Sequence, residues 1–85
     1  MTSDALRAVT VEYYAQLREQ AGASREAVQT AAIDVANLYA QLQQRHGFTL
    51  PQAMLKVAVN AAFVDWQHPL RDGDTVVFVP PVAGG

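Results

Sequence analysis

The sequence predicts an α+β domain in which one mixed sheet of about four to five strands carries one main helix on a single face. Three observations support this prediction. Apolar and polar residues alternate near the start of the chain, a stretch with helical spacing lies in the middle, and a run of β-forming residues ends at a double proline. A chain of 85 residues has room for one such domain with a small core.

The composition limits which functions are possible. Apolar residues make up 51% of the chain and charged residues 16%, so we expect some apolar surface to remain for a partner. The net charge of −2 predicts no basic patch and therefore no nucleic-acid partner. Because no apolar run is long enough to cross a membrane and the first residues do not resemble a signal peptide, we expect a cytoplasmic protein without membrane contact.

Few residues could support catalysis or metal binding. The chain has no cysteine, which excludes disulfides, thiolate ligands and cysteine nucleophiles. Its only histidines, His46 and His68, are far apart in sequence, and there is no glycine-rich phosphate loop. We therefore predict no metal site and no catalytic triad.

The first third of the chain predicts two strands separated by a short helical turn. Residues 1–7 form a polar, unpatterned arm, and the strand that follows alternates with period two. The residues of this strand that are predicted to face the helix are Val9, Val11 and Tyr13. Residues 15–20 are strong helix formers that close on Gly22, and residues 25–30 alternate weakly as a second strand.

The main helix is the clearest element of the middle third. Its apolar residues recur at helical spacing at Val35, Leu38, Tyr39 and Leu42. Asp34 is a good N-cap, and Gly47 is placed to adopt the left-handed conformation that ends a helix. We interpret His46 as a last-turn residue that complements the helix dipole rather than as a catalytic group.

The last third predicts the rest of the sheet. Residues 56–60 and 63–66 have the composition of two short strands. Residues 68–74 form a turn-rich segment with an Asp-Gly pair, and residues 75–79 are nearly all apolar, as expected of a central strand. The predicted domain therefore covers residues 8–79.

Residues 80–85, Pro-Pro-Val-Ala-Gly-Gly, are predicted to form an extended tail that projects from the last strand. Pro80 and Pro81 donate no backbone hydrogen bond and so end the strand. Gly84 and Gly85 have no Cβ and can thread a channel too narrow for a side chain. The reactive group of the tail is the α-carboxylate of Gly85, which is ionised at neutral pH and needs a partner to activate it.

The uncovered face of the sheet is the candidate partner interface. Since successive side chains of a strand alternate between faces, Val77 and Val79 should lie opposite the core residues of the last strand. An apolar patch near the tail is predicted from Tyr14, Phe63, Val77 and Val79. Any one of these residues could instead belong to the core or to ordinary surface.

The sequence resembles the family of sulfur-carrier small subunits of molybdopterin synthase, which are MoaD/ThiS-like ubiquitin-fold proteins. The resemblance is carried by Tyr13–Glu19, Ala58–Asn60, His68–Asp74 and Val77–Gly85. It is most specific in the combination of an Asp-Gly-Asp turn, a double proline and a diglycine end. It implies a ubiquitin-like β-grasp fold.

The resemblance also implies a sulfur carrier in molybdenum cofactor biosynthesis that is not catalytic alone. An ATP-dependent activating enzyme would adenylate Gly85, and a sulfur donor protein would convert the acyl-adenylate to a thiocarboxylate. The tail would then enter the large catalytic subunit and pass its sulfur to cyclic pyranopterin monophosphate. Two small and two large subunits would form a heterotetramer. The chain itself would bind no cofactor, since ATP is used by the activating partner.

The site residues follow from the tail and its surroundings. Gly85 is the residue to be modified, and Gly84 allows threading into the partner. The tail is expected to contribute to the interface through Pro80, Pro81, Val82 and Ala83. Arg18 could contact the large subunit or the activating enzyme, although it could equally be an ordinary solvated arginine.

Other functions are compatible with the same sequence. A sulfur carrier for the thiazole of thiamin, or for another sulfur pathway, would share the fold and the thiocarboxylate. A ubiquitin-like modifier would be conjugated to lysine amines through Gly85. An interaction domain with an idle tail would need neither terminal glycine.

Overall fold

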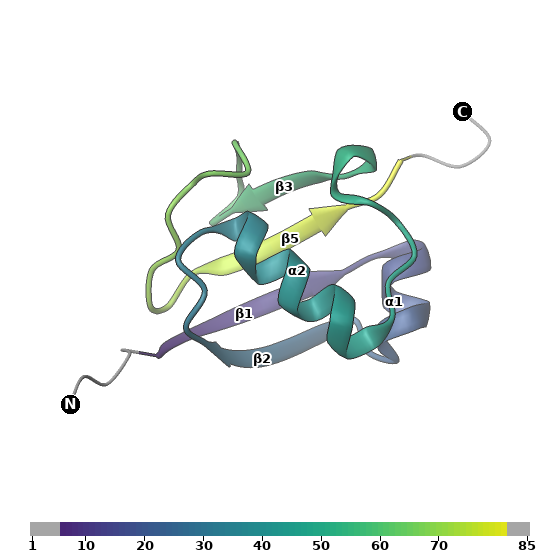
Figure 1. Cartoon of the computed structure of the whole chain (residues 1–85), viewed down its shortest axis with the longest axis horizontal. Coiled ribbons are helices and arrows are strands. Elements are labelled where there is room, and N and C mark those ends of the chain that lie inside the picture. The colour runs from purple at the N-terminus through teal and green to yellow at the C-terminus, as the bar shows by residue number, and fades with distance from the viewer. Residues whose placement is uncertain (1–5, 82–85) are drawn as a thin grey trace.

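The computed structural model describes residues 6–81, and this part of the chain forms a five-stranded mixed sheet with two α-helices (Figure 1). The strands are β1 (Arg7–Tyr13), β2 (Arg25–Thr30), β3 (Lys56–Val59), β4 (Ala62–Val64) and β5 (Thr75–Val79). Their order is β2-β1-β5-β3-β4, with β1 and β5 parallel and the other neighbours antiparallel. β5 is thus the middle strand, which explains why its sequence is almost entirely apolar.

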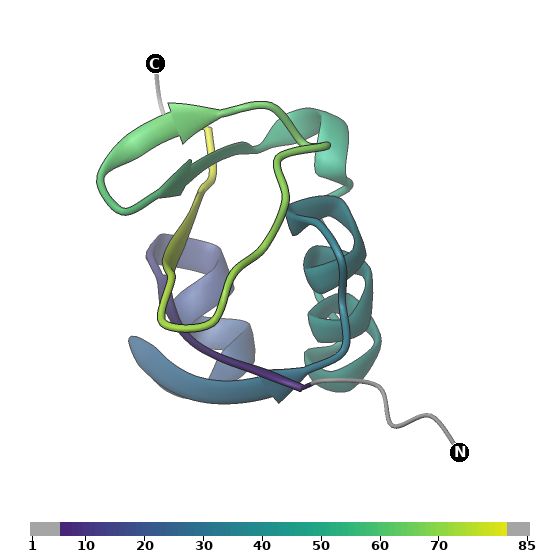
Figure 2. The same ribbon diagram turned by 90° about the vertical axis from the view of Figure 1, so that its left-hand side faces the viewer.

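The helices lie on one side of this sheet. α2 (Val35–His46) crosses the sheet, and Figure 2 shows the sheet curving round it. α1 (Ala15–Ala21) is a shorter helix between β1 and β2, and η1 (Gln52–Met54) is a single 3-10 turn before β3. This arrangement is the β-grasp of ubiquitin-like proteins, and it confirms the α+β prediction with its mixed sheet and one main helix.

α2 begins and ends where its capping residues predict. The Asp34 carboxylate accepts a hydrogen bond of 2.8 Å from the backbone N–H of Asn37, which satisfies one of the unpaired donors of the first turn. Gly47 has a φ of 71°, and its N–H donates to the carbonyl of Gln43 at 2.8 Å. The buried face of the helix is the predicted stripe of Val35, Leu38, Tyr39 and Leu42.

Aromatic side chains fill the space between α2 and the sheet. Tyr39 of α2 lies 5.1 Å from the fully buried Phe78 of β5, measured between ring centroids. Trp66 stacks on Phe78 at 5.9 Å and also lies 6.0 Å from Tyr39, and Phe48 contacts both Tyr39 and Tyr13. These rings bury large apolar areas, so the middle of β5 anchors the helix layer to the sheet.

Three strands, β1, β3 and β4, have boundaries that differ from the predicted ones. Arg7 was predicted to lie in the arm but begins β1, because it pairs with Thr30 of β2. β3 was predicted to run to residue 60 and ends one residue earlier, because Asn60 and Ala61 have positive φ values of 51° and 72° and form a two-residue turn.

The strand predicted over residues 63–66 is shifted as a result of that turn. β4 covers Ala62–Val64, which begins directly after the turn and ends two residues early. Trp66 therefore does not lie in a strand. It packs on the core instead, where its ring stacks with Phe78.

A hydrogen-bonded latch joins the β3–β4 turn to the loop before β5. The buried Asp74 carboxylate accepts from the Asn60 side-chain amide at 3.0 Å and from the backbone N–H of Arg71 at 2.8 Å. Asn60 in turn accepts from the backbone N–H of Thr75 at 3.0 Å. Gly73 has a φ of 89°, which is the left-handed geometry expected of the Asp-Gly pair. The Asp-Gly-Asp turn therefore fixes where β5 starts.

We predict that Asp74→Ala lowers the free energy of unfolding by about 2–4 kcal/mol, because two donors lose a charged acceptor in a buried place. Urea denaturation followed by circular dichroism would measure it. Asp65→Ala is the matched control, since Asp65 is exposed in the loop after β4, and a change below about 0.5 kcal/mol is expected there. Equal effects of the two substitutions would contradict the latch.

Candidate functional site

The candidate site lies at the end of the molecule where β5 leads into the tail. β5 ends at Val79, and the two prolines that follow cannot continue its hydrogen bonding. Pro80 is half-buried and Pro81 is exposed. The remaining predicted tail residues, Val82, Ala83, Gly84 and Gly85, lie outside the described residues.

Among the predicted interface residues, Phe63, Val77 and Val79 are on the face of the sheet that α2 does not cover. Val76 and Phe78 are fully buried, whereas Val77 and Val79 between and after them are only half-buried, as the alternation predicted. Phe63 has 70% of its surface exposed. Strand pairing places Phe63, Val77 and Val79 on the same face of the sheet, away from α2. We call this surface the open face.

The register of the strands brings part of the predicted patch together. Ala58 of β3 pairs with Phe63 on one side and with Val77 on the other, so the three side chains form one row across the open face. Ala58 was missed as a member of this row. The alternation of β3, with Val57 and Val59 in the core, could have placed it there.

A second row lies closer to the tail. Lys56 of β3 pairs with Val79 of β5. Tyr14 is 50% exposed and follows Tyr13, which pairs with Phe78, so Tyr14 lies at the same end of the sheet as Val79. The predicted patch is therefore two adjacent rows rather than one cluster.

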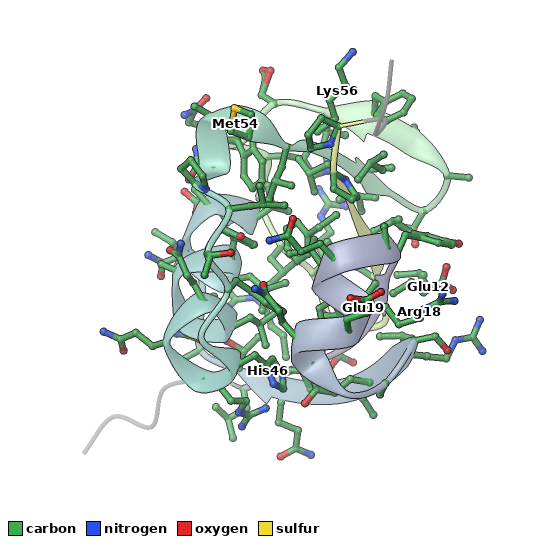
Figure 3. All side chains as sticks on the ribbon, turned by 90° about the vertical axis from the view of Figure 1, so that its right-hand side faces the viewer. Glu12, Arg18, Glu19, His46, Met54 and Lys56 are labelled. Atoms are coloured by element: carbon green, nitrogen blue, oxygen red, sulfur yellow. The ribbon has the colours of Figure 1, made fainter. Side chains whose placement is uncertain are left out.

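A shallow groove runs beside the start of the tail. Its volume is about 290 Å³, and its walls are Met54, Lys56, Val79, Pro80 and Pro81. Met54 has 51% of its surface exposed, although sequence reasoning did not select it. Figure 3 views this end of the molecule and shows Met54 and Lys56 at the same edge of it.

Arg18 lies at the same end, on α1. The buried Leu17 holds α1 against the core, which leaves Arg18 exposed on the outer side of the helix (Figure 3). It lines a cleft with Glu12 and Arg25, whose side chains form an ion pair of 2.8 Å. Among residues 6–81 the ion pairs are Glu12–Arg25, Glu26–Arg45 and Glu26–His46, so Glu12 is already paired and Arg18 is available to a partner.

A charged network that sequence reasoning missed lies next to the end of β1. The Tyr13 hydroxyl donates to Glu26 Oε1 at 2.6 Å, and His46 Nε2 lies 2.9 Å from the same oxygen. Arg45 is 3.2 Å from the other carboxylate oxygen. His46 is in the last turn of α2, as predicted, but it also ties the helix to β2. No local pattern in the sequence connects these four residues.

The network shifts two pKa values. Burial, together with the hydrogen bond to Glu26, raises the pKa of Tyr13 above its usual range. Burial alone would also raise the pKa of Glu26. The hydrogen bonds from Tyr13 and His46 and the charges of His46 and Arg45 outweigh it, so the pKa of Glu26 is lowered.

The described part of the chain offers little for other chemistry. Residues 6–81 contain no group of three or more side chains that could hold a metal ion. In the same range no helix is long and apolar enough to span a membrane. What the geometry does offer is an open face next to the base of the tail that is apolar at Ala58, Phe63 and Val77 and carries the Glu12–Arg25 ion pair over β1 and β2.

Comparison with known proteins is consistent with this geometry. Residues 11–85 match the profile of the ThiS family. Over 80 residues the chain is 36% identical to the molybdopterin synthase sulfur carrier subunit of Escherichia coli (strain K12), covering 91% of this chain and 99% of that protein. It is 38% identical over 80 residues to the protein of the same name from Mycobacterium tuberculosis (strain ATCC 25618 / H37Rv), covering 91% of this chain and 96% of that protein.

A solved structure adds a complex to the comparison. It is the protein–protein complex of subunits 1 and 2 of the molybdopterin-converting factor from Helicobacter pylori 26695. One of its chains superposes on this one with a TM-score of 0.65 at 26% identity, covering 92% of this chain and 99% of that chain.

We predict that the Glu26 network stabilises the fold in a pH-dependent way. Because the pKa of Glu26 is lowered on folding, its contribution is present above the pKa of the unfolded state, about 4.3, and is lost as the pH falls through the folded pKa. Glu26→Gln should therefore be less stable than the parent near pH 7, and the difference should shrink below about pH 4.

Urea denaturation of both proteins between about pH 7 and pH 3 would test this. Glu19→Gln is the control, since Glu19 is exposed on α1 and is in none of the ion pairs among residues 6–81. A stability difference between Glu26→Gln and the parent that stays constant over this range would rule out the network as its source.

Proposed function

The chain belongs to the ThiS family of small ubiquitin-fold proteins, and from this membership we propose that it is the sulfur-carrier subunit of a molybdopterin synthase. The observation that carries the proposal is its similarity to two proteins of that name along almost their whole length. The diglycine at residues 84–85 agrees with it, because a carrier needs a thin, reactive end.

We propose that Gly85 carries the sulfur. Its carboxylate attacks the α-phosphate of ATP on an activating enzyme, which releases pyrophosphate and leaves an acyl-adenylate. A donor protein then supplies sulfur at the oxidation level of sulfide, which attacks the acyl carbon, displaces AMP and leaves a thiocarboxylate, a softer and more nucleophilic group than a carboxylate. Since the chain contains no cysteine, sulfur cannot be carried on a thiol side chain.

The open face and the tail act together in this proposal. β5 carries Val77 and Val79 on the open face and then continues into the prolines, so a partner that covers this face also receives the tail. Pro80 and Pro81 restrict the backbone at the base of the tail, which lowers the entropy lost when the tail is inserted. The Helicobacter pylori complex of two converting-factor subunits supports a partner of this kind.

The catalytic work belongs to the partner. The large subunit binds cyclic pyranopterin monophosphate, which receives the sulfur, while this chain delivers the sulfur and binds no cofactor of its own. Two small and two large subunits form the proposed assembly, with Arg18 and the residues of the open face at the contact. Removing the carrier's terminal group should therefore stop sulfur transfer without unfolding the carrier.

We predict that Gly84→Ala lowers the rate of sulfur transfer by about 100-fold or more, because a methyl group at this place obstructs the channel that the tail enters. Its unfolding transition should match that of the parent. Ala83→Ser is the matched control, since it adds one atom to the neighbouring residue and should keep most activity. Normal turnover by Gly84→Ala would exclude the threading role.

The decisive experiment is an intact mass of the chain after incubation with ATP, its activating enzyme and a sulfur donor. We expect a gain equal to the exchange of one oxygen for sulfur, located at Gly85 by fragmentation. An unmodified mass in the presence of a competent activating enzyme would indicate an interaction domain with an idle tail. A mass that shows attachment to another protein's lysine would indicate a modifier.

A further inference from the structure

Lys56 is the only lysine in the sequence, and it lies beside the base of the tail. It begins β3 and pairs with Val79, the last residue of β5, so its side chain is on the open face. The side chain is exposed, and Figure 3 shows it extending away from the body of the domain.

The surroundings of Lys56 are apolar. It forms one wall of the groove that contains Met54, Pro80 and Pro81, and it also lines a neighbouring hollow of about 270 Å³ with Phe63 and Trp66. Met54 and Phe63 are two of the most exposed large apolar residues of the described chain. A single ammonium group therefore stands between two apolar depressions.

No carboxylate of residues 6–81 forms an ion pair with this ammonium group. The ion pairs in this range use Arg25, Arg45 and His46. If a partner covers the open face, Lys56 loses much of its water, and an ammonium that is dehydrated without a counter-charge is costly. The partner must then either leave the group in water at the rim or supply an anion.

We propose that the large subunit carries a carboxylate that pairs with Lys56 when the open face is covered. This inference rests on the proposed function, and it adds the chemistry of the partner's surface to it. The two hollows beside Lys56 favour contact over exposure at the rim, because filling them brings partner atoms to both sides of the lysine stem. A partner that is apolar or basic at this point is rejected, so Lys56 selects among possible partners.

A zero-length crosslink tests this directly. A water-soluble carbodiimide converts a carboxylate to an O-acylisourea, and an amine in contact with it displaces the urea to form an amide. Because Lys56 is the only lysine, a crosslink through a lysine of this chain must come from Lys56, and we expect peptide mapping to find one from Lys56 Nζ to an Asp or Glu side chain of the large subunit. Lys56→Arg keeps the charge but not the reactive amine, so it should bind within about fivefold of the parent and lose the crosslink.

Affinity measurements give the second test. Lys56→Met should weaken binding of the purified large subunit at least about tenfold, and Lys56→Glu should weaken it by about a hundredfold or more, since like charges then meet. Arg71→Met is the matched control. Arg71 is exposed at the opposite end of β5, so its neutralisation should leave the affinity unchanged.

Three results would overturn the inference. Equal or tighter binding by Lys56→Met would mean that no carboxylate faces Lys56, and this would leave the proposed function intact if sulfur is still found at Gly85. A set of crosslinks in the parent complex that never includes Lys56, or whose only amine from this chain is its α-amino group, would have the same meaning. Failure of the parent itself to bind the large subunit would overturn both proposals together.

Discussion

The structure depends on β5 being the middle strand of the sheet. It is hydrogen-bonded to β1 on one side and to β3 on the other, so its backbone cannot shift without breaking both ladders. Its alternating side chains divide the molecule: Val76 and Phe78 enter the core, and Val77 and Val79 face the opposite way. A slip of one residue would reverse this division, placing Phe78 on the open face and emptying the core beneath α2.

β5 therefore contributes to the stability of the core, to the open face and to the position of the base of the tail. The latch formed by Asn60 and Asp74 fixes the start of β5, and the prolines fix its end. Between these points Phe78 contacts Tyr39 and Trp66, and burial of such a ring stabilises the fold by about 2–3 kcal/mol. The free energy that holds the register thus comes from side chains on the core face of β5, opposite the open face. The domain can therefore present an open face beside Pro80 and Pro81 without weakening its core.

The sequence was sufficient to predict the elements whose signal is local. Alternation located β1 and the two faces of β5, and capping residues located the ends of α2. Features that depend on contacts distant in sequence were not predicted. The network of Tyr13, Glu26 and His46 joins two strands and a helix, and no periodicity indicates it. The turn at Asn60 and Ala61 was missed because alanine seldom adopts positive φ, and this error displaced the predicted β4.

The charges at the tail end of the molecule have two different uses. Glu26 is held by Tyr13, His46 and Arg45, so it stabilises the packing of α2 on β2 and has little capacity left for a partner. Lys56 has no such internal partner among the described residues and sits on an apolar face. In the proposed function one carrier meets several proteins, and the separation of these two kinds of charge then has a consequence. The Glu26 network can keep the fold constant, while the exposed ammonium group of Lys56 distinguishes one partner from another. The free-energy cost of dehydrating this group depends on the charge that each partner places opposite it.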